Sequence, residues 1–202
     1  MSGVVLRVLA SFAVGVSAAG AEASLQDAGD SGRKWARAVR VENGAVRVDG
    51  RLDEAAWRDA PAITDFTQKE PIEGMPATEP MEVRFVFDGV ALYIGARMRS
   101  ADPTRIQAPM GRRDNVDQAE YLQVSFDTYL DRRTAYTLGV TAAGVRFDHY
   151  HASDNEDEID PTFDPVWEAK TSVDEQGWTA ELWVPFSQLR FNAADEIGRA
   201  HV

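Results

Sequence analysis

The sequence of 202 residues contains no cysteine, so disulfide bonds, a thiolate nucleophile and a cysteine-bound zinc are all excluded. It also lacks an apolar run long enough to cross a bilayer as a helix, since the N-terminal run ends after residues 8–19. Basic residues are few, because 21 Lys and Arg face 33 Asp and Glu, for a formal net charge of -12. Nucleic acid and anionic membrane surfaces are therefore not expected as partners.

Common catalytic motifs are absent as well. The chain has no Gly-x-Ser-x-Gly, no His-Glu-x-x-His and no phosphate-binding loop. Carboxylates are plentiful, but sequence spacing alone does not place two of them across a scissile bond. We therefore predict no catalytic residue in this part of the protein.

The N-terminus has the pattern of a secretory signal. Arg7 precedes the apolar run, and small residues follow it up to position 23. We predict a signal peptide over residues 1–23, cleaved after Ala21 or Ala23, and a flexible polar leader over residues 24–36. The mature protein is then exported and is periplasmic, associated with the outer membrane or secreted. The alternative, a buried amphipathic helix, would need polar residues at helical spacing within the run.

Residues 120–151 alternate apolar and polar side chains in three short runs. Such alternation is typical of strands with one dry and one wet face. The pattern predicts an antiparallel meander whose dry face carries the following side chains: Leu122, Val124, Phe126, Tyr136, Leu138, Val140, Val145, Phe147 and His149. We expect function on the wet face and in its loops.

Further hairpin signals flank the meander. Asn43-Gly44 and Asp88-Gly89 favour two-residue turns, and residues 166–173 and 178–185 form another strand pair. Asp53 is the expected N-cap of a helical turn that carries Trp57. Residues 82–87 and 90–98 should form a strand pair. In this pair, Val83, Phe85 and Phe87 lie on one face. The fold class is therefore all-β, an antiparallel β-sandwich.

Four segments together resemble a known family. They are VDGRLDEAAW, EVRFVFDGVALYIGARM, RRDNVDQAEYLQVSFDTYLDRRTAY and VWEAKTSVDEQGWTAELWVPFSQLRF. In this order they resemble carbohydrate-binding module family nine, in the version found at the N-terminus of large exported bacterial proteins. The resemblance implies an immunoglobulin-like β-sandwich over residues 37–196 that grips a terminal sugar between aromatic rings.

The chain departs from this family at the expected sugar site. The stacking Trp of the family would fall near Asp117, a polar Glu at Gln123 and an Arg at Gly139, and the second stacking Trp would lie beyond residue 202. The closing C-terminal strands of the sandwich are also expected to be missing. Residues 197–202, IGRAHV, resemble a translated sequencing adapter, which suggests that they are an artefact.

Candidate ligand-binding residues come from the loop and strand where the family site opens. They are Arg112, Arg113, Asp114, Glu120 and Gln123, with Trp183 as a separate outward-facing aromatic. A planar Arg fork suits paired hydroxyls or a carboxylate. The alternative interpretation is a salt-linked surface loop.

Two histidines and an acidic loop are candidate metal ligands. His149 and His151 share a strand face, and residues 152–165 supply carboxylates. The candidate set is His149, His151, Asp154, Glu156 and Asp160. The loop is oxygen-rich enough for calcium, although it lacks the glycine of an EF-hand. A solvated acidic loop is the alternative.

We therefore expect an exported, noncatalytic, saccharide-binding β-sandwich of a longer protein, linked to carbohydrate catabolism. The complete protein would then be a glycan-active hydrolase. The alternative is a structural domain that docks on its own missing C-terminal region, an outer-membrane or hydrolase domain, without binding sugar. A metal-dependent hydrolase is a third interpretation.

Overall fold

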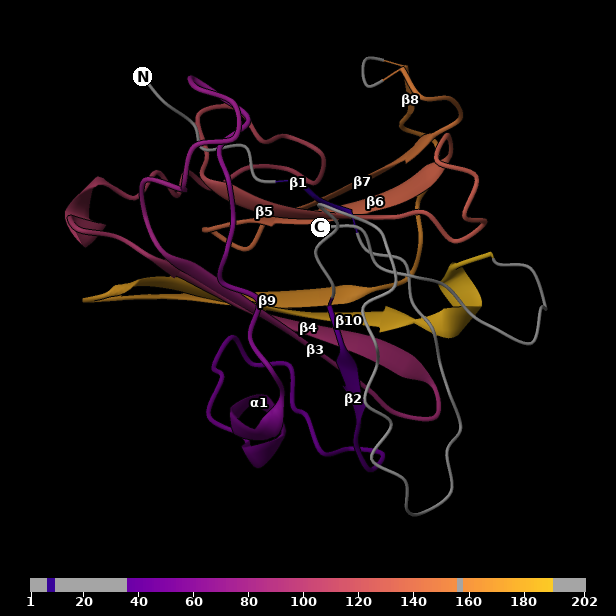
Figure 1. Cartoon of the computed structure of the whole chain (residues 1–202), viewed down its shortest axis with the longest axis horizontal. Coiled ribbons are helices and arrows are strands. Elements are labelled where there is room, and N and C mark those ends of the chain that lie inside the picture. The colour runs from indigo at the N-terminus through magenta and orange to yellow at the C-terminus, as the bar shows by residue number, and fades with distance from the viewer. Residues whose placement is uncertain (1–6, 10–35, 156–157, 191–202) are drawn as a thin grey trace.

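The computed structural model describes residues 7–9, 36–155 and 158–190, and it forms two sheets packed face to face (Figure 1). Sheet A has the order β1 (Arg7–Leu9), β5 (Tyr121–Phe126), β6 (Ala135–Thr141), β7 (Arg146–His151), β8 (Ile159–Asp160). Sheet B has the order β2 (Ala38–Arg40), β3 (Met81–Phe87), β4 (Ala91–Arg99), β10 (Gly177–Pro185), β9 (Glu168–Asp174). The predicted all-β sandwich is confirmed.

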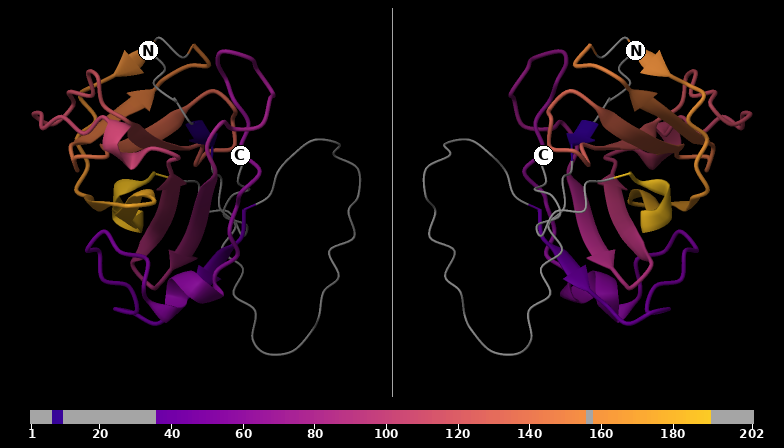
Figure 2. Two further views of the ribbon diagram at one scale, coloured as in Figure 1. Left: turned by 90° about the vertical axis from the view of Figure 1, so that its left-hand side faces the viewer. Right: turned by 90° about the vertical axis from the view of Figure 1, so that its right-hand side faces the viewer.

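Helical structure in the described residues is limited to short segments. They are the helix α1 (Ala55–Asp59) and two 3₁₀ turns, η1 (Pro103–Arg105) and η2 (Phe186–Gln188). Figure 2 shows from both sides that α1 lies beyond sheet B, on the face turned away from sheet A. Part of sheet B is therefore covered on both faces.

The core between the sheets follows the predicted alternation. Val83 pairs with Ala96, Phe85 with Ile94 and Phe87 with Leu92, so these apolar side chains share one face. Leu122, Val124 and Phe126 of β5 meet them from sheet A, and each is at most 1% exposed. Local alternation was sufficient to identify these faces because both sides of each strand differ strongly in polarity.

Strand β7 departs from its predicted orientation. Leu138 pairs with Asp148 and Gly139 pairs with Phe147, so Asp148 faces the core and Phe147 faces outward. Val145 precedes the strand. The dry-face assignment of Phe147 and His149 is therefore wrong. Asp148 is accommodated at this position because its carboxylate accepts hydrogen bonds from Arg113 and Trp167, which come from other segments of the chain.

The first predicted hairpin is also wrong. The Asn43-Gly44 turn forms, with a hydrogen bond from Ala45 N to Glu42 O, but β2 pairs in parallel with β3. The residues after the turn form no strand, and Val46 instead packs with Trp57 on sheet B. Tertiary packing of this segment outweighs the local turn preference.

Helix α1 is held to sheet B by a buried carboxylate. Glu181 of β10 is 0% exposed and accepts hydrogen bonds from Asp49 N (2.8 Å), Gly50 N (2.7 Å) and Trp57 Nε1 (2.8 Å). The N-cap of α1 is Glu54 rather than the predicted Asp53, and its side chain makes no capping bond. The glutamate therefore fixes the segment that leads into α1.

Several predicted segments lie wholly or partly outside the described residues. The structure describes only β1 of the predicted signal peptide, and there the backbone pairs in parallel with β5. Residues 24–35 and 191–202 fall outside, which includes the adapter-like hexapeptide and the place where a further strand was expected. Within the described part of the chain, no helix is long and apolar enough to span a membrane.

Candidate functional site

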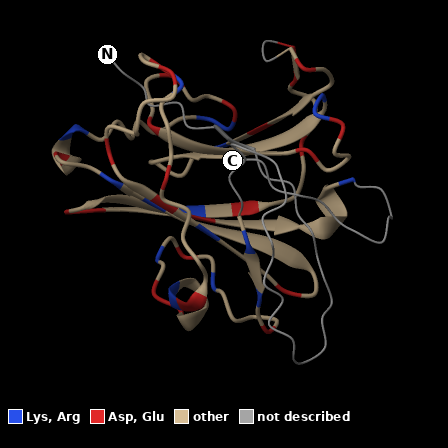
Figure 3. Ribbon diagram, viewed as in Figure 1, with Lys and Arg blue, Asp and Glu red and all other residues tan. Residues whose placement is uncertain are grey.

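The side of sheet A that is turned away from sheet B carries a row of uncharged side chains. Strands β5 and β6 contain no charged residue, as Figure 3 shows. We call this surface the outer face of sheet A; its residues are Tyr121, Gln123, Ser125, Thr137, Gly139, Phe147, His149 and His151. The alternation of β5 and β6 predicted this side to be the wet face, but Gln123, Ser125 and Thr137 on it are at most 5% exposed. Gln123 and the two histidines were predicted ligands, whereas Tyr121, Ser125 and Thr137 were not.

Gln123 lies at the centre of this face. It pairs with Gly139 across the strands, and Gly139 pairs with Phe147 on the next strand. The residues that the family resemblance aligned with a polar Glu and an Arg are therefore direct neighbours. Gln123 is 5% exposed, so its amide is a deep rather than a peripheral group of this face.

The absence of a side chain at Gly139 makes room for an aromatic ring. A Cβ atom at Gly139 would lie 2.0 Å from Cζ of Phe147, so the ring occupies that space. Phe147 in turn meets Tyr121 edge to face, with ring centroids 5.3 Å apart. Two aromatic rings therefore adjoin the Gln123 amide where the family resemblance implied a cation.

Hydroxyl and imidazole groups continue the row. Ser125 Oγ and Thr137 Oγ1 are 2.8 Å apart in a buried hydrogen bond. Thr137 pairs with His149, whose Nε2 lies 3.1 Å from Nε2 of His151. The eight named residues of the outer face of sheet A thus combine an amide, hydroxyls, imidazoles and aromatic rings, and none of them is Asp, Glu, Lys or Arg.

The candidate Arg113 binds carboxylates of its own chain. Its Nη2 lies 2.7 Å from Asp148 Oδ2 and 2.6 Å from Asp164 Oδ1. Burial raises the pKa of the Asp148 carboxyl, against the opposing hydrogen bonds from Trp167 and Arg113. Asp114 joins this group, since its Oδ1 accepts from Asp148 N at 3.4 Å. The group links the loop before β5 to β7 at the sandwich edge.

The other loop candidates are not gathered with Gln123. Arg112 is exposed and Asp117 lies in an exposed turn capped by Asn115. Glu120 directly precedes β5 and is hydrogen-bonded to Trp178 and Gln107. Burial raises the pKa of Glu120, although hydrogen bonds from Gln107 and Trp178 oppose that shift. The predicted polar ligand cluster is thus divided between two different places.

Trp183 lies on the opposite sheet. It faces outward from β10 and packs with the cluster formed by α1, Tyr93 and Val86. Its indole bonds to Tyr93, whose pKa is raised to about 12, chiefly by burial and by the hydrogen bond to Asp88. This side chain therefore belongs to the packing of α1 on sheet B and is remote from Gln123.

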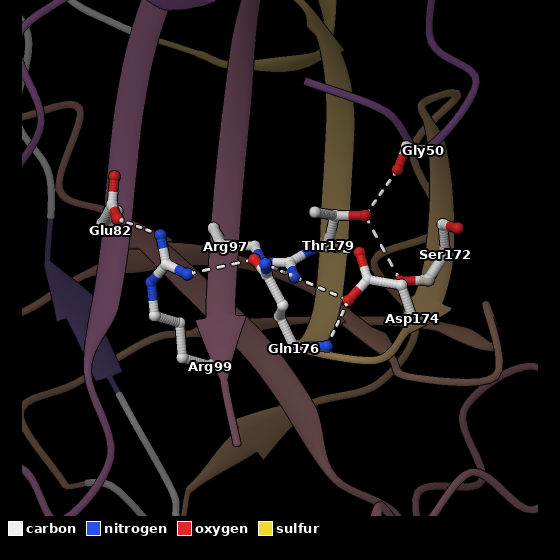
Figure 4. A network of polar contacts seen from close by, with 8 residues as sticks. All are labelled: Gly50, Glu82, Arg97, Arg99, Ser172, Asp174, Gln176 and Thr179. Carbon is white, nitrogen blue, oxygen red and sulfur yellow. Dashed lines mark hydrogen bonds and ion pairs between the residues drawn. The ribbon is translucent and has the colours of Figure 1, made fainter. Parts of the chain in front are cut away.

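Beside that cluster, the outer face of sheet B carries a network of ion pairs (Figure 4). Arg97 donates two hydrogen bonds of 2.6 Å to the two carboxylate oxygens of Asp174. Arg99 donates hydrogen bonds to Glu82 and to Gln176. Arg97 lowers the pKa of Asp174 to about 2. The guanidinium groups in this network are satisfied by neighbouring side chains, which is consistent with a structural role.

The predicted metal set is not assembled in the described residues. No group of three His, Asp or Glu side chains there has a metal-binding arrangement. Asp154 is exposed, Glu156 falls outside the described residues, and Asp160 Oδ1 accepts from Thr162 N and Oγ1. The acidic loop contains the short strand β8, which pairs with β7 and was not expected.

Comparisons with known proteins bear on the fold. No protein-family model matches the sequence, and no curated protein matches it. A carbohydrate-binding module of family 9 from Caldicellulosiruptor kristjanssonii, solved with glucose, is similar at a TM-score of 0.50 and 16% identity, over 78% of this chain and 73% of that one. A family 9 module from the same organism, solved with cellotriose, is similar at a TM-score of 0.48 and 13% identity, over 81% of this chain and 83% of that one. The fold of this chain is similar to that of a family 9 module.

Proposed function

We propose that this domain is a noncatalytic recognition module that binds a neutral saccharide on the outer face of sheet A. The observation that carries the proposal is the neutral row around Gln123, in which an amide and hydroxyls adjoin the Tyr121–Phe147 ring pair. Sugar hydroxyls bond to amides and hydroxyls, whereas the C–H faces of a sugar pack on aromatic rings. The fold agrees with this function, since the similar family 9 module was solved with glucose.

The chemistry of this face favours uncharged sugars. Phe147 fills the space above Gly139, so position 139 itself supplies no cation to pair with a uronic acid. The formal net charge of -12 would also repel an acidic glycan at long range. The family resemblance would put a stacking Trp near Asp117; without it, one face of the sugar loses contacts worth about 1 kcal/mol, and affinity should be weak.

The test is calorimetric titration of the whole chain with cello- and xylo-oligosaccharides. Binding should weaken at least about tenfold in Gln123→Ala, because a buried amide then no longer bonds the ligand. Gln176→Ala is the matched control, since Gln176 belongs to the ion-pair network of sheet B. Binding that survives Gln123→Ala but disappears in Trp183→Ala would place the ligand on sheet B and contradict the proposal.

A structural docking domain is the second candidate. It is favoured by the low exposure of the outer face of sheet A, where Gln123 is 5% and Thr137 0% exposed. Under this alternative, Gln123→Ala lowers stability but no oligosaccharide binds at any concentration tested. A glycan-array screen with the complete protein separates the two candidates, because only the first predicts a reproducible neutral-sugar signal.

The proposal includes export and a part in carbohydrate catabolism, as one domain of a longer glycan-active protein. Its support is the N-terminal pattern, in which Arg7 precedes an apolar run and small residues follow. N-terminal sequencing of the secreted or periplasmic protein should begin at Glu22 or Ser24 if cleavage follows Ala21 or Ala23. An intact Met1 on exported protein would contradict signal cleavage.

A further inference from the structure

His149 and His151 present their ring nitrogens to one another on the outer face of sheet A. Side chains two residues apart on a strand point to the same side, and here a hydrogen bond of 3.1 Å joins Nε2 of one ring to Nε2 of the other, with His151 9% exposed. The ring centroids are 4.8 Å apart and the planes are inclined at 77°. The rings are therefore arranged edge to face, with their Nε2 atoms brought together.

The separation of the two nitrogens matches that of two ligands on one metal ion. Zinc–imidazole bonds of about 2.0–2.1 Å place two nitrogens about 3.4 Å apart at a tetrahedral angle and about 2.9 Å apart at a right angle. The observed 3.1 Å lies between these values. A metal would sit beside the line between the nitrogens, so the rings need to turn about their side-chain torsions but not to move apart.

We infer that His149 and His151 form a two-imidazole chelate for a late first-row divalent ion, Zn²⁺, Ni²⁺ or Cu²⁺, with water completing its coordination. Imidazole suits these ions, whereas calcium prefers oxygen ligands. The negative net charge of the chain attracts cations to its surface. The site needs none of the loop carboxylates that the sequence suggested. The two imidazoles lie on the same outer face of sheet A as the proposed saccharide site, next to Thr137.

The inference is tested with the whole chain and the metal salts alone. Calorimetric titration with Ni²⁺ and Zn²⁺ should give one site per chain. Loss of either imidazole, in His149→Asn or His151→Asn, should weaken binding by about tenfold or more. His201 is the third histidine of the chain, so His201→Asn is the matched control and should leave this binding unchanged. Calcium should give no comparable signal.

Two further measurements identify the ligands. Bound Cu²⁺ should show hyperfine coupling to two imidazole nitrogens in its electron paramagnetic resonance spectrum, and to fewer in either single variant. Imidazole binds metal in its neutral form, so affinity should fall from about pH 7.5 to about pH 5.5. Thermal melts in chelator confirm that each variant is folded. Metal binding that persists in the folded double variant, or that is absent in the folded wild-type chain, would overturn the inference.

Discussion

The ring of Phe147 lies over Gly139, in the space that a side chain at position 139 would need. A Cβ there would be 2.0 Å from Cζ of the ring and 2.5 Å from its Cε atoms. The ring is itself held edge to face by Tyr121. This contact explains why a glycine is accommodated in a central strand, where glycine ordinarily weakens pairing. The same contact places the Phe147 ring, rather than a side chain at position 139, next to Gln123.

Gly139→Ala should therefore destabilise the domain by about 1–3 kcal/mol, because the added methyl group overpacks a filled site. The measurement is the midpoint and slope of urea-induced unfolding. In a Phe147→Ala background the same substitution should cost almost nothing, since the space is then empty. Equal costs in both backgrounds would show that the ring does not occupy the site, because residues in contact must couple.

Glu181 should be the most sensitive carboxylate of sheet B. Its two oxygens accept three hydrogen bonds, so in Glu181→Gln the new NH₂ group must face at least one N–H donor. The expected loss is about 1–3 kcal/mol in the free energy of unfolding. Asp174→Asn is the control. Its carboxylate is 50% exposed, so its loss should stay below about 1 kcal/mol. A larger loss in Asp174→Asn would contradict this ranking.

Arg113 should stabilise the fold most at neutral pH. Burial already raises the pKa of Asp148, so the folded state holds this proton more tightly than the unfolded chain. The contribution of Asp148 to stability is therefore greatest at low pH and falls as pH rises through its raised pKa. Arg113→Ala removes a group that lowers the pKa of Asp148, so the ionised carboxylate becomes less favourable in the folded state. The loss in the free energy of unfolding should therefore reach about 2 kcal/mol near pH 7 and shrink near pH 4.

Unfolding curves at several pH values check this prediction. Adding Asp148→Asn to Arg113→Ala should recover stability at neutral pH, because an amide oxygen still accepts from Trp167 and no buried charge remains. Arg112→Ala, in the exposed neighbouring position, should have little effect at any pH. A pH-independent loss in Arg113→Ala would show that the ion pair with Asp148 is not its cause.

The sequence predicted those parts of the fold that local patterns determine. The β3–β4 hairpin and the inward faces of its strands follow from alternation, but the hydrogen bond from Asp88 N to Ala91 O centres the turn on Gly89 and Val90 rather than on the predicted Asp88-Gly89. Strand β7 was misassigned because Asp148 looks like a surface residue until Arg113 and Trp167 are brought to it. The parallel pairing of β2 with β3 likewise depends on a contact between distant segments.

The candidate site was likewise predictable only where strand alternation determines the face on which a residue lies. Alternation placed Gln123 on the side predicted to be wet, and the structure pairs it with Gly139 on that side but leaves it 5% exposed. The resemblance did not reveal that Phe147 fills the space above Gly139. Sequence proximity grouped Arg113 and Glu120 with Gln123, but Glu120 is hydrogen-bonded to Trp178 and the Asp148 pair holds Arg113 at the sandwich edge. Trp183 faces outward as expected, on the other sheet.

The most direct test of saccharide recognition on sheet A is to map a bound sugar by nuclear magnetic resonance. Isotope-labelled chain would be titrated to saturation with cellotriose while backbone amide shifts are recorded. The account predicts the largest changes at Gln123, Thr137 and Gly139, with the Trp183 indole signal unmoved. Changes centred on Trp183, or a spectrum unaltered by every neutral oligosaccharide tested, would contradict it.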